Sequence, residues 1–266
     1  MSERDDLVGA LDSAGVLAGI RWAFLSAADR VLEDYSEAAG HDATWVGVTR
    51  FTLFRDRLDR VFSCRRYAVA EGADGELSLD ILHAELTERD VKTFPKLDPE
   101  LVVRADLSGS PGWSNEGTRW LLASSAFGKL DEVPWPQKST TKQRVAQQPT
   151  DAPDEPTLFD HLTSDEQAGL ATLMTGSKLD LHTLVVGHSL DAEHGGRELV
   201  IGQPRLNSGG GSAWYWKHDL LQAPPSEGGR LRPSAPAPVG PDTTPDAPVK
   251  LRRPAAEQPN RGQAGR

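Results

Sequence analysis

Apolar residues recur at three- and four-residue steps in the first part of the chain, which is the pattern of a helix with one buried face. Between Asp12 and Ala39 these positions are Val16, Ile20, Ala23, Phe24, Ala27, Val31 and Tyr35. From Val48 to Phe62 they are Val48, Phe51, Phe54, Leu58, Val61 and Phe62. The pattern predicts two helices, with Gly40 as a C-terminal stop for the first.

Short segments rich in Val, Ile and Leu follow, separated by polar turn residues, and these predict strands. Three of them cover residues 66–70, 76–86 and 99–107, and a brief helix is expected from Thr87. A tight turn then leads into residues 115–128, whose pattern fits either a strand or a short helix.

The last patterned region reads as three strands joined by Gly-rich turns, the arrangement of an antiparallel meander. The strands are expected at 182–190, 197–206 and 213–221. Taken together, the patterns predict an α+β fold with a helical N-terminal part, short mixed strands and a small C-terminal antiparallel meander.

Composition breaks at two places and divides the chain. Residues 134–156 and 223–266 are rich in Pro and poor in apolar residues, so neither buries enough surface to offset the entropy of ordering. We therefore predict an N-terminal α+β module at 1–133 and a flexible linker at 134–156. A small helix-plus-meander module follows at 157–222, and a disordered Pro/Gly/Ala-rich tail at 223–266. Whether the two modules share one core is left open.

The chain is acidic, with 29 Lys+Arg against 39 Asp+Glu and a formal net charge of −10. This balance argues against broad nonspecific binding to nucleic acid or to an anionic membrane surface. The tail has more basic than acidic residues and permits a weak nucleic-acid contact. The chain has neither a signal-peptide pattern nor a run of about 18 apolar residues, so a cytoplasmic protein without a membrane span is expected.

Four arginines follow the polar side of the second predicted helix: Arg50, Arg55, Arg57 and Arg60. One interpretation is a DNA-reading helix, whose arginines would contact phosphates and base edges. The alternative is an ordinary solvated face, because Asp56 and Asp59 are spaced to pair with Arg60 and Arg55. These arginines are the nucleic-acid-binding candidates.

Residues Gly187-His188-Ser189-Leu190-Asp191 follow the apolar run LVV. They resemble the nucleophile elbow of the α/β-hydrolase family, Gly-x-Ser-x-Gly after a strand. The resemblance implies Ser189 as nucleophile, with His188, His194 and Asp191 as the nearby acid–base candidates. Asp191 stands where the family has its last glycine, and little chain remains for the acid and histidine that follow the serine there. We therefore predict that Ser189 is not a nucleophile and that its hydroxyl bonds a backbone group of the 191–196 turn.

No cofactor or metal is expected. The chain contains neither GxxxxGK[ST] nor GxGxxG after a strand. Its one cysteine, Cys64, precludes a cysteine-based zinc site and is expected in the core. His182 and His188 would lie ~20 Å apart along a strand, too far to share one ion. The tryptophans Trp113, Trp120 and Trp135 are expected to fill the core rather than to line a pocket.

The end of the predicted linker reads Glu155-Pro156-Thr157-Leu158-Phe159. It resembles the short peptide by which bacterial replication and repair proteins dock on the sliding clamp. That resemblance implies that Leu158 and Phe159 fill an apolar pocket, with Thr157 as the small polar residue. The alternative is a hydrophobic staple in which Leu158 and Phe159 lead into the next helix.

These observations favour a non-catalytic binding or accessory subunit that acts through protein partners, near nucleic acid if the arginine helix or the tail contributes. The alternative is a hydrolase-type enzyme with its site around Gly187-His188-Ser189. An enzyme site assembled across the two modules would draw on Arg104, Asp106 and Arg119.

Overall fold

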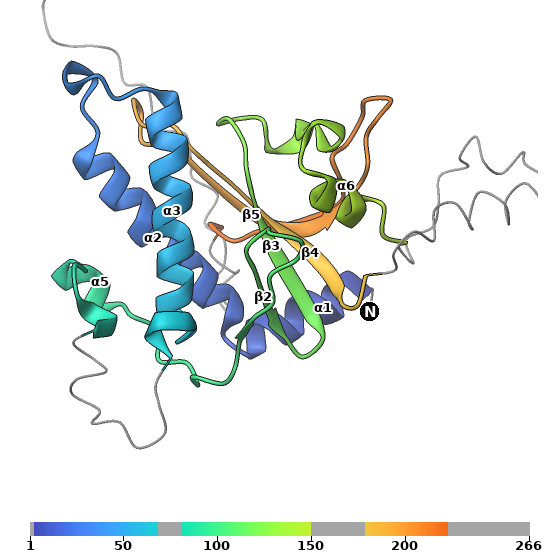
Figure 1. The fold of residues 1–266 in the computed structure, drawn as a ribbon, viewed down its shortest axis with the longest axis horizontal. Helices are drawn as coiled ribbons and strands as arrows, with labels where there is room; N and C mark the ends of the chain where they lie inside the picture. The colour runs from blue at the N-terminus through green and yellow to red at the C-terminus, as the bar shows by residue number, and fades with distance from the viewer. Residues whose placement is uncertain (1–2, 69–80, 150–178, 223–266) are drawn as a thin grey trace, which may run out of the picture. The chain divides into compact units, whose positions relative to one another are not determined.

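The computed structural model describes residues 3–68, 81–149 and 179–222, all of which lie in one compact unit, Met1–Pro224 (Figure 1). The fold is α+β, as predicted, with its longest helices in the N-terminal part. The described α-helices are α1 (Glu3–Ser13), α2 (Val16–Asp34), α3 (Ala43–Val61), α5 (Glu88–Lys92) and α6 (Thr140–Ala146). The 3-10 turns are η1 (Glu37–Ala39), η2 (Arg65–Tyr67), η3 (Leu130–Glu132) and η4 (Trp135–Gln137).

One mixed sheet of six strands runs in the order β1-β2-β3-β4-β5-β6. The strands are β1 (Val103–Arg104), β2 (Gly112–Asn115), β3 (Thr118–Ser124), β4 (His182–Leu190), β5 (Arg197–Pro204) and β6 (Trp214–Asp219). Strands β4, β5 and β6 form the predicted antiparallel meander. β3 and β4 pair in parallel, with Ser124 opposite His188. Strands from both predicted modules therefore belong to one sheet, which answers the question of a shared core.

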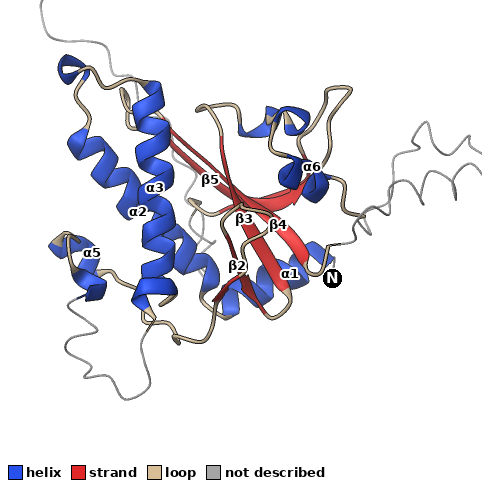
Figure 2. Ribbon diagram, viewed as in Figure 1, coloured by secondary structure: helices blue, strands red, loops and turns tan. Residues whose placement is uncertain are grey.

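Alternate residues of the central strands belong to two different hydrophobic cores. Leu122, Leu184 and Val186 pack with residues of α2 and α3. Leu121 and Val185 point the other way and pack with residues of η3, η4 and α6. Figure 2 shows the pair α2 and α3 and the short helix α6 on opposite sides of the strands. Side chains alternate between the faces of a strand, so a sheet covered on both sides buries nearly continuous apolar runs.

Three tryptophans are fully buried and fill these cores, as predicted. Trp113 and Trp120 pack on the α2–α3 side of the sheet, and Trp135 packs on the α6 side. Cys64 is also buried, again as predicted.

The first predicted helix corresponds to α2, which ends at Asp34, before the stop expected at Gly40, and its predicted start at Asp12 falls at the end of a separate helix, α1. Gly15 separates α1 from α2 with a φ of 78°, and Leu97 lies 2.8 Å from the position that a Cβ would occupy there. Apolar spacing does not report backbone φ, so the interruption has no signal in the hydrophobic pattern. α3 begins at Ala43, earlier than predicted, because the Asp42 carboxylate caps it by accepting a hydrogen bond from the Trp45 N–H at 2.8 Å.

Two predicted strands are wrong in their described parts, since Arg65–Tyr67 is the 3-10 turn η2 and residues 81–83 are helical. The segment 134–149 also differs from the flexible linker expected there, since it contains η4 and α6. Trp135, Val145 and Ala146 from this segment are buried on the second face of the sheet. Their burial stabilises a stretch whose average composition is polar.

The predicted tail and the Thr157-Leu158-Phe159 motif lie outside the described residues. Within the described ranges, no single helix is long and apolar enough to cross a membrane. α1 and α2 meet that length and composition only as a pair bent by 73°.

Candidate functional site

The α3 arginines do not form the exposed positive face that the sequence suggests. Arg50, Arg57 and Arg60 are only 3%, 4% and 6% exposed, and Arg55 is partly exposed. A DNA-reading face and a solvated face both need exposed guanidinium groups, which these three arginines lack, although the predicted pair of Asp56 with Arg60 is present.

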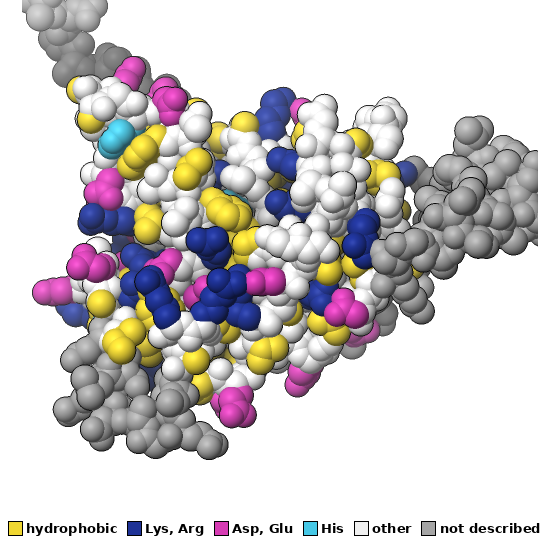
Figure 3. All heavy atoms as spheres, in the orientation of Figure 1, with side chains coloured by type: hydrophobic (Ala, Val, Ile, Leu, Met, Phe, Trp, Pro, Cys, Tyr) yellow, Lys and Arg dark blue, Asp and Glu magenta, His cyan; other side chains and the backbone are white. Residues whose placement is uncertain are grey.

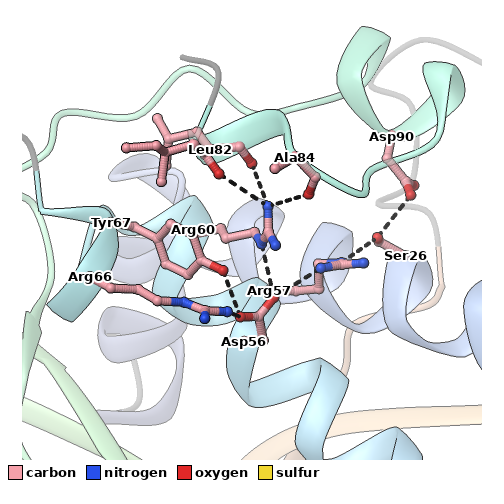
Figure 4. Close-up of polar contacts among 10 residues, drawn as sticks. Ser26, Asp56, Arg57, Arg60, Arg66, Tyr67, Leu82, Ala84 and Asp90 are labelled. Carbon is pink, nitrogen blue, oxygen red and sulfur yellow. Dashed lines mark hydrogen bonds and ion pairs between the residues drawn. The ribbon is translucent and has the colours of Figure 1, made fainter. Parts of the chain in front are cut away.

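Two of the buried arginines belong to a polar network centred on Asp56 (Figure 4). The Asp56 carboxylate accepts hydrogen bonds from Arg57 Nη1 at 2.9 Å, Arg60 Nε at 2.8 Å, Arg66 Nη2 at 2.5 Å and the Tyr67 hydroxyl at 2.7 Å. Burial opposes ionisation of Asp56, but the Tyr67 hydroxyl and the guanidinium groups of Arg60 and Arg66 outweigh it and hold the pKa of the carboxyl below its usual value. The network therefore acts as a structural clamp on α3.

The clamp extends to neighbouring elements. Arg60 Nη1 donates to the carbonyl oxygens of Leu82 at 2.8 Å and Ala84 at 2.7 Å. Arg57 Nε donates to the Ser26 hydroxyl at 3.1 Å, and that hydroxyl donates to Asp90 at 3.0 Å (Figure 4). Arg57 and Arg60 thus join α3 to α2 and to the segment that leads into α5.

The helical spacing suggested that Asp59 pairs with Arg55. In the structure Asp59 instead bonds residues of β1 and β2. Its carboxylate accepts from Trp113 Nε1 at 3.1 Å and from Arg104 Nη1 at 3.2 Å. Arg104 also lies 4.2 Å above the Trp113 ring and pairs with Asp106 at 2.7 Å. The third cross-module candidate, Arg119, pairs instead with Asp180 at 2.7 Å.

Ser189 is fully buried, and its hydroxyl donates to the carboxylate of Glu198. The two residues face each other across β4 and β5, which explains the contact. The expected bond to the 191–196 turn is therefore wrong. Glu198 also accepts from the Gly128 N–H at 2.9 Å, so it holds the loop that follows β3 against β5.

The other candidates of the elbow motif do not converge on Ser189. His188 precedes it on the strand and so points to the opposite face, where its ring lies 5.1 Å from that of Phe54. His194 is exposed and pairs with Asp191 at 2.9 Å. Asp191 also accepts from the backbone N–H groups of Glu193 and His194, which is the bonding of a turn.

His188 is fully buried, and neither ring nitrogen has a hydrogen-bond partner among the described residues. Burial lowers the pKa of this imidazole well below its usual value, and the positive charges of Arg50, Lys142 and Lys138 lower it further. The buried ring is therefore neutral and lies near three cations.

Two of these cations, Arg50 and Lys138, line an open pocket of about 840 Å³. The pocket lies where the parallel strands β3 and β4 end, between the start of α3 and the chain from Ser124 to Lys138. Crevices beside the carboxyl ends of parallel strands are common ligand sites. Its apolar lining includes Tyr35, Val46, Phe127 and Leu190. Figure 3 shows Lys and Arg atoms in the hollow between α3 and α6.

The polar groups of the pocket converge on the last residue of β3. Arg50 Nη2 donates to the Ser124 hydroxyl at 2.6 Å, and Lys138 Nζ donates to the Ser124 carbonyl oxygen at 2.9 Å. Burial lowers the pKa of Arg50 to about 10 and also lowers the pKa of Lys138. Burial and the charge of Lys138 together lower the pKa of Lys142 in α6. In the described part of the chain, none of these three cations forms an ion pair with a carboxylate.

From the sequence, Arg50 is a nucleic-acid candidate, and neither Ser124 nor the lysines Lys138 and Lys142 are predicted as site residues. The sequence feature that points to these two lysines is their spacing, since Lys138 and Lys142 lie four residues apart in a run without an acidic residue. Such a pair lies on one side of a helix or helical turn.

Among the residues that the structure describes, no group of three or more His, Cys, Asp or Glu side chains is placed to bind a metal ion. Burial raises the pKa of the Cys64 thiol to about 11. Comparison with known protein families, curated proteins and solved structures finds no match for this chain, so its function has to be inferred from its own residues.

Proposed function

We propose that this chain is a non-catalytic binding protein, an accessory component whose recognition site is the pocket between α3 and residues 124–138. The observation that carries the proposal is the make-up of the pocket. It has a volume of about 840 Å³ and a lining of mixed apolar and polar residues, and Arg50 and Lys138 both reach Ser124. Small-molecule sites are typically clefts of about 300–1,000 Å³ with mostly apolar walls and a few convergent polar groups.

The side chains considered for catalysis support a binding role over a hydrolase. The Ser189 hydroxyl is buried and engaged with Glu198, while His188 lies on the opposite face of β4. A serine nucleophile needs a base within hydrogen-bond distance and a path for the substrate. As part of the proposal, the protein works in the cytoplasm and acts through a protein partner, with nucleic acid as a weaker second contact.

Filling the pocket is expected to abolish ligand binding without unfolding the protein. Gly47 lines the pocket in α3, and a Cβ built on it meets nothing within 4 Å. The bulky ring of Gly47→Trp should occupy the cavity, while the loss of a helical glycine favours folding by roughly 0.5–1 kcal/mol. Ligand-observed NMR with a library of small fragments on the full-length chain should give binders that Gly47→Trp no longer binds.

The matched control is Gly9→Trp in α1, since a Cβ at Gly9 also meets nothing within 4 Å. This variant should bind the same fragments as the wild type. Fragments that bind Gly47→Trp as well as the wild type, or a wild type that binds none, would contradict the proposed function.

Ser189 is expected to ignore fluorophosphonate probes, because its hydroxyl is buried and donates to a carboxylate. Ser189→Ala should lower the free energy of unfolding by about 1.5–3 kcal/mol, the range for a hydrogen bond to a charged group. Gel-based labelling and urea denaturation measure the two effects. Labelling of the wild type that Ser189→Ala abolishes would instead establish the hydrolase alternative.

A further inference from the structure

Arg50 and Lys138 line the pocket and, among the described residues, lack the carboxylate partners that the buried arginines Arg57, Arg60 and Arg119 have. Arg57 and Arg60 bond Asp56, Arg104 bonds Asp59 and Asp106, and Arg119 bonds Asp180. Arg50 is 3% exposed and has the Ser124 hydroxyl as its hydrogen-bond acceptor. Its Nε is buried without any acceptor among the described residues. Burying a charge without a counter-charge costs several kcal/mol, so the ligand-free pocket holds an uncompensated positive charge.

The carboxylates at the rim of the pocket do not supply the missing charge. Glu132 pairs with Lys129 at 2.9 Å. Asp191 pairs with His194 and caps its own turn. Glu193, the third acidic residue of the lining, is exposed and forms no ion pair with the described residues.

We infer that the pocket binds a small organic oxyanion, whose phosphate or carboxylate group lies against Arg50 and Lys138 and whose apolar body lies along Val46, Phe127 and Leu190. The inference rests on the proposed function and specifies its ligand class. Arginine suits this task because its planar guanidinium bonds oxyanions with defined geometry, and lysine adds a point charge. A bare inorganic ion fills only a small part of about 840 Å³, which is why an organic body is required.

By the same argument, the buried charge of Arg50 lowers the stability of the protein when no ligand is bound. Arg50→Met removes an uncompensated buried charge and keeps an unbranched apolar side chain of similar length. The ligand-free variant should therefore unfold at the same denaturant concentration as the wild type or at a higher one. An oxyanion should stabilise the wild type in proportion to its binding and should not stabilise Arg50→Met.

The test compares three probes on the full-length chain by thermal shift and titration calorimetry: phenyl phosphate, benzoate and the neutral analogue benzyl alcohol. Phenyl phosphate or benzoate should bind the wild type, and Arg50→Met should weaken that binding at least tenfold. Lys138→Met should also weaken the binding of these anions. Because Lys138 is less buried than Arg50, this variant replaces Arg50→Met in the test if Arg50→Met folds poorly. Arg55→Met is the matched control, because it removes the same charge from the same helix outside the pocket lining, and it should bind like the wild type.

The outcomes separate this inference from the proposed function. Suppose that benzyl alcohol binds as well as the anions, and that its binding is unaffected by Arg50→Met but is lost in Gly47→Trp. That result would overturn the inference of an anionic ligand and would leave the proposed binding pocket standing. If inorganic phosphate binds as tightly as phenyl phosphate, the inference that the ligand has an apolar organic body is overturned. If the wild type binds no probe and no fragment, the proposed function fails together with the inference.

Discussion

Replacing Asp56 by alanine is expected to lower the free energy of unfolding by about 3–5 kcal/mol, the range for removing one partner of a buried ion pair. The carboxylate accepts from Arg57, Arg60, Arg66 and the Tyr67 hydroxyl, and its side chain is 19% exposed. Without it, the nearly buried charges of Arg57 and Arg60 repel each other with nothing between them. Urea denaturation of the full-length chain, followed by tryptophan fluorescence, measures the loss.

Two further variants locate the effect. Asp56→Asn keeps an acceptor oxygen but loses the charge, so it should lie between wild type and Asp56→Ala. Glu33→Ala removes a carboxylate from an exposed pair with Arg30, at 3.7 Å, and should cost less than about 0.5 kcal/mol. An Asp56→Ala variant that is no less stable than Glu33→Ala would show that the arginines find other partners and that Asp56 does not hold the clamp together.

The part of the fold that the sequence predicts well is the part with local signals. In β4 and β5 the apolar runs end at Gly-bearing turns, and the predicted strands match the observed ones closely. The burial of Trp113, Trp120 and Trp135 follows from the size and apolar surface of the indole. These properties belong to each residue and its near neighbours, and therefore appear in the pattern.

The parallel pairing of β3 with β4 has no such signal. It joins residues about 60 positions apart, Thr118 with His182 for example, and hydrophobic alternation does not specify a partner strand. Composition predicts a flexible linker at 134–149 because an average gives the Pro and polar residues the same weight as Trp135 and Val145. Those two side chains are fully buried, and they decide where the segment packs.

The candidate site was hidden for a similar reason. Arginines at helical spacing look alike in a sequence, but Arg57 meets Asp56 and Ser26, whereas Arg50 meets Ser124 at the end of a distant strand. Burial and the supply of counter-charges depend on these long-range contacts. The contact of Arg50 with Ser124 therefore has no signal in the sequence near Arg50.

Replacing His188 by leucine is expected to change how the stability of the protein depends on pH. The imidazole is fully buried, and burial followed by the charges of Arg50, Lys142 and Lys138 holds its pKa well below the usual value. Below the unfolded-state pKa of about 6.5, the unfolded chain takes up a proton on this ring that the folded chain does not. The wild type should therefore lose about 1.4 kcal/mol of stability per pH unit from this residue as the pH falls, which is roughly 2 kcal/mol at pH 5.

His188→Leu cannot show this loss, since leucine takes up no proton. At pH 7.5 it should be at least as stable as the wild type, because an apolar side chain replaces two ring nitrogens that have no partner among the described residues. Its advantage should then widen by roughly 2 kcal/mol between pH 7.5 and pH 5 in urea denaturation. His194→Ala removes an exposed histidine and retains the His188 ring, so it should keep the wild-type profile. If the stabilities of wild type and His188→Leu fall in parallel with pH, the buried ring takes up its proton in the folded state, and the three cations beside it are neutralised or move away.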